Sequence, residues 1–184
     1  MGARQIGKTT LIRQFGKEQY SCFVEINFIT DTDATKIFAG NLDANTIITN
    51  LTAYTRKPMI PGNTLVLLDE IQACPNARTA IKFLVEDGRF DYIESGSLLG
   101  VRHKEVRSYP VGFEELYQMY PMDLEEYLWA NGVQKSTIQY LKDCYETGTP
   151  VTDAIHQTMC KLLYSYIVVG GMPDVVQTYV NTHD

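Results

Sequence analysis

Hydrophobic residues in the first two thirds of the chain fall into short continuous runs separated by segments with helical spacing. The clearest run covers residues 65–68, four consecutive apolar positions followed directly by two carboxylates. Such a run is typical of a strand buried on both faces of a parallel sheet. Residues 20–28 and 90–94 are rich in β-branched and aromatic side chains, which predicts two further strands.

The segments between these strands predict helices. Residues 8–17 carry apolar side chains at helical spacing, and Gly16 is a candidate end signal for this helix. Residues 34–39 and 44–54 are expected to form two short helices, and residues 76–86 a longer one. Helices that alternate with strands indicate an α/β fold, here a three-layer sandwich around a mostly parallel sheet.

The last third of the chain is predicted to be mostly helical. One more strand is expected at residues 115–119, before Pro121. The helices that follow are expected at residues 124–130, 136–145, 153–169 and 173–180. The pattern therefore predicts two domains, a core over residues 1–120 and a small helical lid region over residues 121–184.

The start of the chain carries candidate chemistry. Gly2, four residues, and then Gly7, Lys8 and Thr9 match the phosphate-binding pattern G-x-x-x-x-G-K-[ST]. Glycines let backbone N–H groups turn inward around an anion, and the helix that follows points its positive end at the same place. Lys8 adds a charge for the β- and γ-phosphates, and the Thr9 hydroxyl is a ligand suited to Mg²⁺. The alternative interpretation is a glycine-containing turn before an ordinary helix.

The residues expected to contact the nucleotide are those of the loop and of the helix start: Gly2, Ala3, Arg4, Gln5, Ile6, Gly7, Lys8, Thr9 and Thr10. A phosphate-binding loop normally follows a buried strand. Only Met1 precedes Gly2 in this sequence. The sheet is therefore expected to lack its first strand within these residues.

Two carboxylates, Asp69 and Glu70, follow the apolar run at residues 65–68. Ligands of open α/β sheets bind at the carboxyl ends of the strands. Asp69 is expected to hold the Mg²⁺, directly or through a water, and Glu70 to polarise the attacking water as general base. The alternative for these two residues is a helix cap, since an acidic residue after a strand often begins the next helix.

Three other features lie at or beyond the third predicted strand. Ser97 follows that strand and is a candidate for a hydrogen bond to the γ-phosphate or to the attacking water, or else belongs to a plain turn. Residues 102–107 form a local basic cluster, either a solvated loop or the source of an arginine for a neighbouring site. The three histidines are isolated and show no metal-ligand spacing.

Composition narrows the class of protein. The chain has 184 residues, of which 45% are hydrophobic, and a net charge of −6. This charge gives no overall electrostatic signal for nucleic acid or for an anionic membrane surface. The four cysteines are far apart and form no C-x-x-C pair, and no signal peptide or membrane span is evident. We therefore expect a cytoplasmic protein with reduced thiols.

Several stretches together resemble a large prokaryotic group of AAA-like P-loop ATPases, close to the archaeal-type and STAND ATPases. They are GARQIGKTTLI, LVLLDEIQACP, ESGSLLG, YPMDLEEYLWANG and GGMPDVV, and the resemblance runs from Gly2 to about residue 180. It implies ATP and Mg²⁺ as ligands and a P-loop fold with an additional strand. Members of the group carry an N-terminal segment with the first strand and a sizeable C-terminal domain, so the chain is expected to be truncated at both ends. DNA contact through that C-terminal domain is not supported by this segment.

The resemblance also implies residue roles. Lys8 and Thr9 are implied to bind phosphates and Mg²⁺, Asp69 to bind Mg²⁺, and Glu70 to act as catalytic base. Ser97 is implied at the sensor position. The triplet Gly171-Met172-Pro173 looks like the lid motif of STAND proteins, in which the proline packs on adenine. Pro173 is therefore a further candidate nucleotide contact.

The sequence predicts binding and Mg-dependent hydrolysis of ATP. ATP is preferred to GTP because the guanine-specific N-K-x-D motif is missing. One alternative is a switch that binds the nucleotide and hydrolyses it slowly, so that a protein partner reads its conformation. The other two alternatives are a small-molecule kinase and a fragment with impaired nucleotide binding. Self-association into a homo-oligomer and a protein partner of unknown identity remain open.

Overall fold

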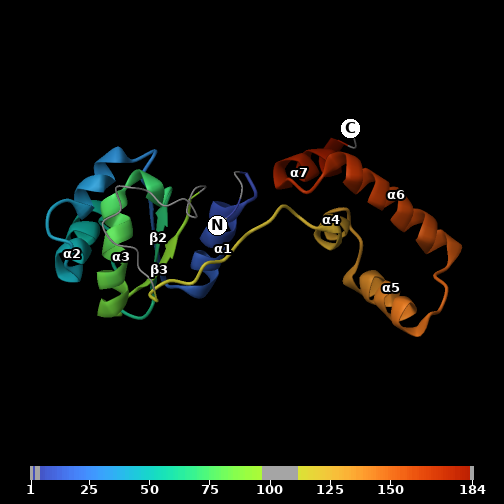
Figure 1. Ribbon diagram of the computed structural model, residues 1–184, viewed down its shortest axis with the longest axis horizontal. Coiled ribbons are helices and arrows are strands. Elements are labelled where there is room, and N and C mark those ends of the chain that lie inside the picture. Colours follow the sequence, from blue (N-terminus) through green and yellow to red (C-terminus); the bar gives the residue numbers. More distant parts are fainter. Residues whose placement is uncertain (1, 3–4, 97–111, 183–184) are drawn as a thin grey trace. The chain divides into compact units, whose positions relative to one another are not determined.

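The computed structural model describes residue 2, residues 5–96 and residues 112–182. The chain divides into two compact units, which are described separately. The first consists of Met1–Gly2 and Gly7–Met119, and the second of Ala3–Ile6 and Tyr120–Asp184. The first unit is α/β and the second is helical (Figure 1).

A three-stranded parallel sheet organises the α/β unit. Its strands are β1 (Cys22–Asn27), β2 (Thr64–Asp69) and β3 (Asp91–Glu94), in the spatial order β1-β2-β3. Every residue of β2 is buried, as the continuous apolar run predicts. The register places Asn27 beside Asp69, so the carboxyl ends of β1 and β2 meet at one edge of the sheet.

Helices cover both faces of this sheet (Figure 1). Helix α1 (Lys8–Gln19) covers one face, and α2 (Ala44–Thr55), α3 (Pro75–Asp87) and the 3-10 helix η1 (Thr32–Phe38) cover the other. A second, short 3-10 helix, η2 (Ile71–Ala73), joins β2 to α3. The three-layer α/β arrangement expected from the sequence is confirmed.

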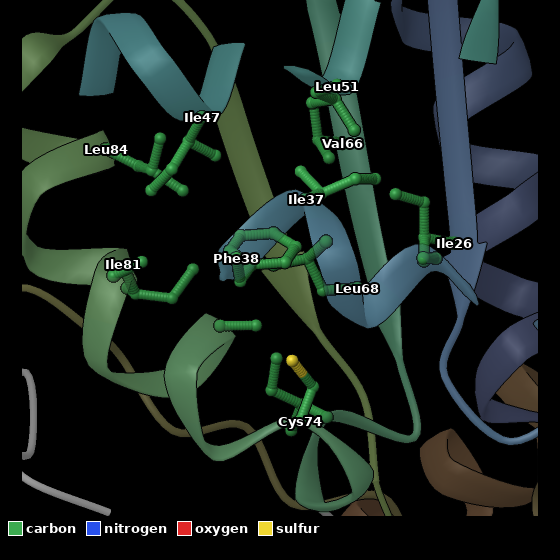
Figure 2. Close-up of a cluster of buried hydrophobic side chains, with 14 of the residues drawn as sticks. Ile26, Ile37, Phe38, Ile47, Leu51, Val66, Leu68, Cys74, Ile81 and Leu84 are labelled. Atoms are coloured by element: carbon green, nitrogen blue, oxygen red, sulfur yellow. The ribbon is translucent and has the colours of Figure 1, made fainter. Parts of the chain in front are cut away.

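The hydrophobic core lies between the sheet and the layer of α2, α3 and η1. Figure 2 shows Val66 and Leu68 of β2 pointing into this layer, where Phe38 and Leu84 meet them. Because side chains alternate across a strand, Leu65, Leu67 and Asp69 point to the opposite face, toward α1. This alternation places the Asp69 carboxylate on the face covered by α1, near the start of that helix.

Gly16 does not end the first helix, contrary to the sequence prediction. Helix α1 continues to Gln19, and Gly16 lies buried within it against the Phe23 ring of β1. A Cβ atom at this position would lie 2.4 Å from Phe23 Cδ2, well inside van der Waals contact. Glycine is therefore needed here for close packing of helix on strand rather than as a stop signal.

Two other local predictions need correction. The short helix expected at residues 34–39 is the 3-10 helix η1, which covers Thr32–Phe38 and is not an α-helix. The strand expected at residues 115–119 is wrong, because this segment has no strand structure. Leu116 and Tyr117 are 60% and 69% exposed, so the segment does not have the half-buried pairing surface that gives β-branched and aromatic residues their strand preference.

The helical unit contains α4 (Leu124–Ala130), α5 (Lys135–Thr147), α6 (Asp153–Val169) and α7 (Pro173–Thr182). Asp123 caps α4 in a capping box with Glu126, as its position before the helix suggests. Tyr127 is fully buried in this unit and hydrogen-bonds Ser165 of α6. None of the helices in the described part of the chain combines the length and the apolar character that crossing a membrane requires.

Candidate phosphate and metal site

The backbone at the start of α1 has the geometry of an anion-binding turn. Gly7 has φ +83° and precedes the helix, and its carbonyl accepts the first helical hydrogen bond from Leu11 N at 3.0 Å. Gln5 also has a positive φ, +62°. The first N–H groups of a helix have no acceptor within the helix, and no side chain caps α1 at Gly7. These N–H groups and the helix dipole favour a negatively charged ligand here.

Lys8 is held across the loop. Its Nζ donates a hydrogen bond to the Gly2 carbonyl oxygen at 3.1 Å. The charged amine therefore lies beside the Gly2 carbonyl oxygen, at the first glycine of the predicted phosphate-binding pattern. A flexible ammonium group in this place can exchange a carbonyl for phosphate oxygens with a small change of side-chain conformation.

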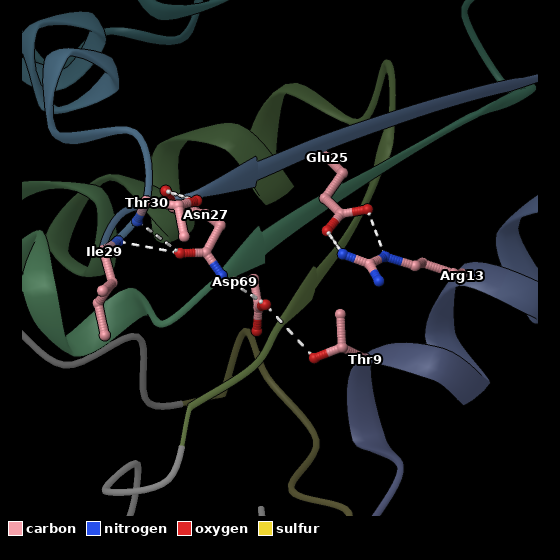
Figure 3. A network of polar contacts seen from close by, with 7 residues as sticks. All are labelled: Thr9, Arg13, Glu25, Asn27, Ile29, Thr30 and Asp69. Atoms are coloured by element: carbon pink, nitrogen blue, oxygen red, sulfur yellow. Dashed lines mark hydrogen bonds and ion pairs between the residues drawn. The ribbon is translucent and has the colours of Figure 1, made fainter. Parts of the chain in front are cut away.

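The side chains of Thr9 and Asp69 are in contact although 60 positions separate them in the sequence. Thr9 Oγ1 donates a hydrogen bond to Asp69 Oδ2 at 3.3 Å (Figure 3). Thr9 comes from the first turn of α1, and Asp69 from the carboxyl end of β2, where it is 4% exposed. The two side chains that the sequence offers as metal-ligand candidates thus lie in contact with each other.

Glu70, the candidate base, is held in an unusual backbone conformation. Its φ and ψ are 53° and 44°, the left-handed region that residues other than glycine rarely adopt. Gln72 Nε2 donates a hydrogen bond to its side chain, and Ile71 N donates to Ser95 O at 3.0 Å. Strained residues cluster at functional sites. Glu70 is also the N-cap residue of η2, so its position agrees both with a helix cap and with the predicted base.

Comparison with known protein families decides the classification. A family model described as "AAA domain" matches residues 1–128, which is more than half of the chain. The chain belongs to this AAA family. No curated protein and no solved structure matches it. Family membership supports nucleotide binding of the ATPase type in general, and the AAA fold agrees with the parallel sheet flanked by helices.

The candidate ligands of this AAA protein suit a magnesium ion that also binds phosphates and waters. They do not suit a metal ion whose ligands all come from the protein. Among the described residues, no group of three or more His, Cys, Asp and Glu side chains could hold a metal ion. Thr9 and Asp69 instead offer one hydroxyl and one carboxylate. Mg²⁺ commonly binds through one or two carboxylates together with substrate phosphates and waters.

Not all the predicted site residues can be placed. Ala3, Arg4 and Ser97, and the basic cluster at residues 102–107, lie outside the described residues. Pro173 begins α7 in the helical unit, and its packing on adenine stays a prediction. Gly171 of the same triplet has a structural role, because a Cβ there would lie 2.1 Å from the Met122 carbonyl oxygen.

Sequence reasoning missed two members of the site. Asn27 donates from Nδ2 to Asp69 Oδ2 at 2.9 Å, and Arg13 pairs with Glu25 to fasten α1 to β1 (Figure 3). The sequence signal for Asn27 was its position as a polar residue near the carboxyl end of the strand predicted at residues 20–28, without an indication of which strand lies beside it. Parallel neighbours bring such ends together.

A buried charge cluster lies at the end of β3. The Arg78 side chain of α3 is 8% exposed and pairs with both Glu94 and Glu114. Burial raises the pKa of Glu94 to about 7, a shift that Arg78 opposes and the nearby Glu114 charge reinforces. Glu114 is the more exposed of the two carboxylates that pair with Arg78.

This cluster predicts a pH-dependent stability. Between about pH 4.5 and 7 the folded protein retains a proton on Glu94 that the unfolded chain has lost. Stability therefore falls as the pH rises through this window, by roughly 3 kcal/mol. Glu94→Gln should flatten that part of the profile, as measured by urea unfolding followed by far-UV circular dichroism. Glu86→Gln, at a more exposed glutamate, is the control, and an equal slope in Glu94→Gln and wild type would contradict the prediction.

Proposed function

We propose that the protein binds Mg·ATP at the start of α1 and hydrolyses it at the carboxyl end of β2. The observation that carries the proposal is the contact between Thr9 Oγ1 and Asp69 Oδ2 at 3.3 Å. It brings together the hydroxyl that follows a phosphate-loop lysine and a buried carboxylate after an apolar strand. Neither residue type alone is informative, but this pairing is what a phosphate-bridged Mg²⁺ needs.

Each residue has one step in the proposed reaction. The N–H groups at Gly7–Thr9 and the Lys8 ammonium bind the β- and γ-phosphates, and Thr9 and Asp69 hold the metal. Mg²⁺ held by these two residues would supply neutralisation of the charge that develops on the phosphate oxygens. Glu70 accepts a proton from water as the water oxygen bonds to the γ-phosphorus. The bond from the γ-phosphorus to the bridging oxygen breaks, and ADP and inorganic phosphate leave.

The wider proposal concerns the remaining predicted features. It takes residues 1–120 as the ATPase core and residues 121–184 as a helical lid, with Pro173 against adenine and Ser97 sensing the γ-phosphate. It also includes a cytoplasmic location and self-association, which is frequent among AAA proteins. The family match over residues 1–128 covers the whole core and only the first eight residues of the lid region.

Lys8→Ala tests the binding step. Loss of a charged hydrogen-bond donor to phosphate is expected to weaken ATP binding by about 10- to 100-fold, measured by isothermal titration calorimetry. Lys36→Ala is the matched control, since this lysine is 78% exposed and pairs only locally with Asp33. Equal ATP affinity in wild type and Lys8→Ala, with unchanged melting temperatures, would contradict the proposed site.

A further inference from the structure

The side chain of Asn27 lies against the proposed metal ligand. Asn27 ends β1, and the parallel register places it directly beside Asp69 at the end of β2. Its Nδ2 donates to Asp69 Oδ2 at 2.9 Å, a shorter contact than that of Thr9 with the same oxygen (Figure 3). Two donors from two different elements, β1 and α1, therefore converge on one carboxylate oxygen.

The orientation of the Asn27 amide is fixed by its other end. Oδ1 accepts hydrogen bonds from the backbone N–H groups of Ile29 and Thr30, each at 3.0 Å. An amide has an acceptor end and a donor end, and only the acceptor end can satisfy two N–H groups. The donor end must then face Asp69. The turn after β1 thus determines which atom of Asn27 the carboxylate meets.

The chemistry of this contact suits a metal ligand. A lysine or arginine in the place of Asn27 would pair with Asp69 and offset the negative charge that attracts a cation. A neutral amide instead restrains rotation of the carboxylate and leaves its charge intact. Hydrogen-bond partners of metal-ligating carboxylates orient the ligand in this way.

We propose that Asn27 is a positioning residue that holds the Asp69 carboxylate in the orientation required for Mg²⁺. This inference rests on the proposed function, since it assigns a role within the same site. In this role, Asn27 makes no contact with the nucleotide. It acts through Asp69, and the turn at residues 28–30 keeps it in place.

Asn27→Ala tests the role through the magnesium dependence of ATP binding. The variant should need about 10-fold more Mg²⁺ for half-maximal ATP binding, while ATP affinity without Mg²⁺ changes less than about 2-fold. Asn63→Ala is the matched control. Its Oδ1 accepts from Ser21 N at 2.8 Å and its Nδ2 donates to Ser21 Oγ at 2.8 Å, at the opposite end of the strands, so it loses equivalent bonds away from the site.

Two further variants separate positioning from a general effect on folding. Asn27→Ser retains a side-chain oxygen that can accept from the turn N–H groups, but it has no amide donor for Asp69. It should show the same magnesium shift as Asn27→Ala with a melting temperature closer to wild type. In an Asp69→Ala background, Asn27→Ala should cause no further shift, because the residue through which it acts is gone.

The outcomes are distinguishable. If wild type binds ATP with magnesium dependence and Asn27→Ala and Asn27→Ser match it, the positioning role is overturned while the proposed function stands. An additional shift of full size in the Asp69→Ala background also overturns it, because Asn27 would then act independently of Asp69. If wild type itself shows no magnesium dependence, the proposed function and the inference fail together.

Discussion

Replacing Glu70 by glutamine is expected to lower ATP turnover by about 100- to 10,000-fold, the range that a general base typically contributes. Glutamine has nearly the same shape but cannot accept the proton of the attacking water at neutral pH. ATP affinity should change little, because the phosphates are held by the loop at Gly7 and by Lys8. The measurement is steady-state release of phosphate at saturating Mg·ATP, with calorimetric ATP affinity beside it.

The local structure makes this substitution a clean test. Glu70 has the left-handed φ of 53°, and its carboxylate accepts from Gln72 Nε2, a bond that a glutamine oxygen can still accept. Glu18→Gln, in the exposed last turn of α1, is a control of identical chemistry. Turnover of Glu70→Gln at the wild-type rate would rule out the base assignment. Slow single turnover with tight ATP retention in wild type would instead favour the nucleotide-gated switch.

Leu68→Ala is expected to lower the free energy of unfolding of the α/β unit by roughly 3 to 5 kcal/mol. Leu68 is 1% exposed and lies in the middle strand, which neighbouring strands flank and helices cover on both faces. A cavity there has little room to collapse, so the cost should lie at the upper end for leucine.

The effect of Leu68→Ala on stability must be measured with a probe that lies in the sheet. The single tryptophan, Trp129, lies on α4 in the helical unit, so its fluorescence reports on the other part of the chain. Hydrogen exchange of the β2 amides under native conditions reports the opening of the sheet directly. Leu116→Ala, at a leucine that is 60% exposed, should change this opening by less than about 0.5 kcal/mol. Equal effects of both substitutions would contradict the central position of β2.

The parts of the fold that were predictable depend on local pattern. The apolar run at residues 65–68 identified β2, which extends one residue further at each end, because a strand buried on both faces needs continuous hydrophobicity. Helix α6 was also predicted with its observed bounds, Asp153–Val169, because Gly170 breaks it. In both cases the deciding information lies within a few residues of the element.

Features that depend on neighbours distant in sequence were mispredicted or missed. Gly16 was interpreted as a stop, but its role depends on Phe23 of the adjacent strand. Residues 115–119 were predicted as a strand but lack strand structure, and Leu116 and Tyr117 are largely exposed. Asn27 acquires its contact with Asp69 only through the register of β1 on β2. Side-chain pattern alone does not specify which strand lies beside which.

The central claim is that one site at the start of α1 and the end of β2 binds the triphosphate and its metal. The most direct measurement is a crystal structure of the wild-type chain with Mg²⁺ and a non-hydrolysable ATP analogue. The expected result is Lys8 Nζ on the β- and γ-phosphates, and the Thr9 hydroxyl on Mg²⁺ at about 2.0–2.1 Å, with Asp69 on the metal or on one of its waters. A triphosphate bound elsewhere, or an Asp69 carboxylate that turns away from the metal, would contradict it.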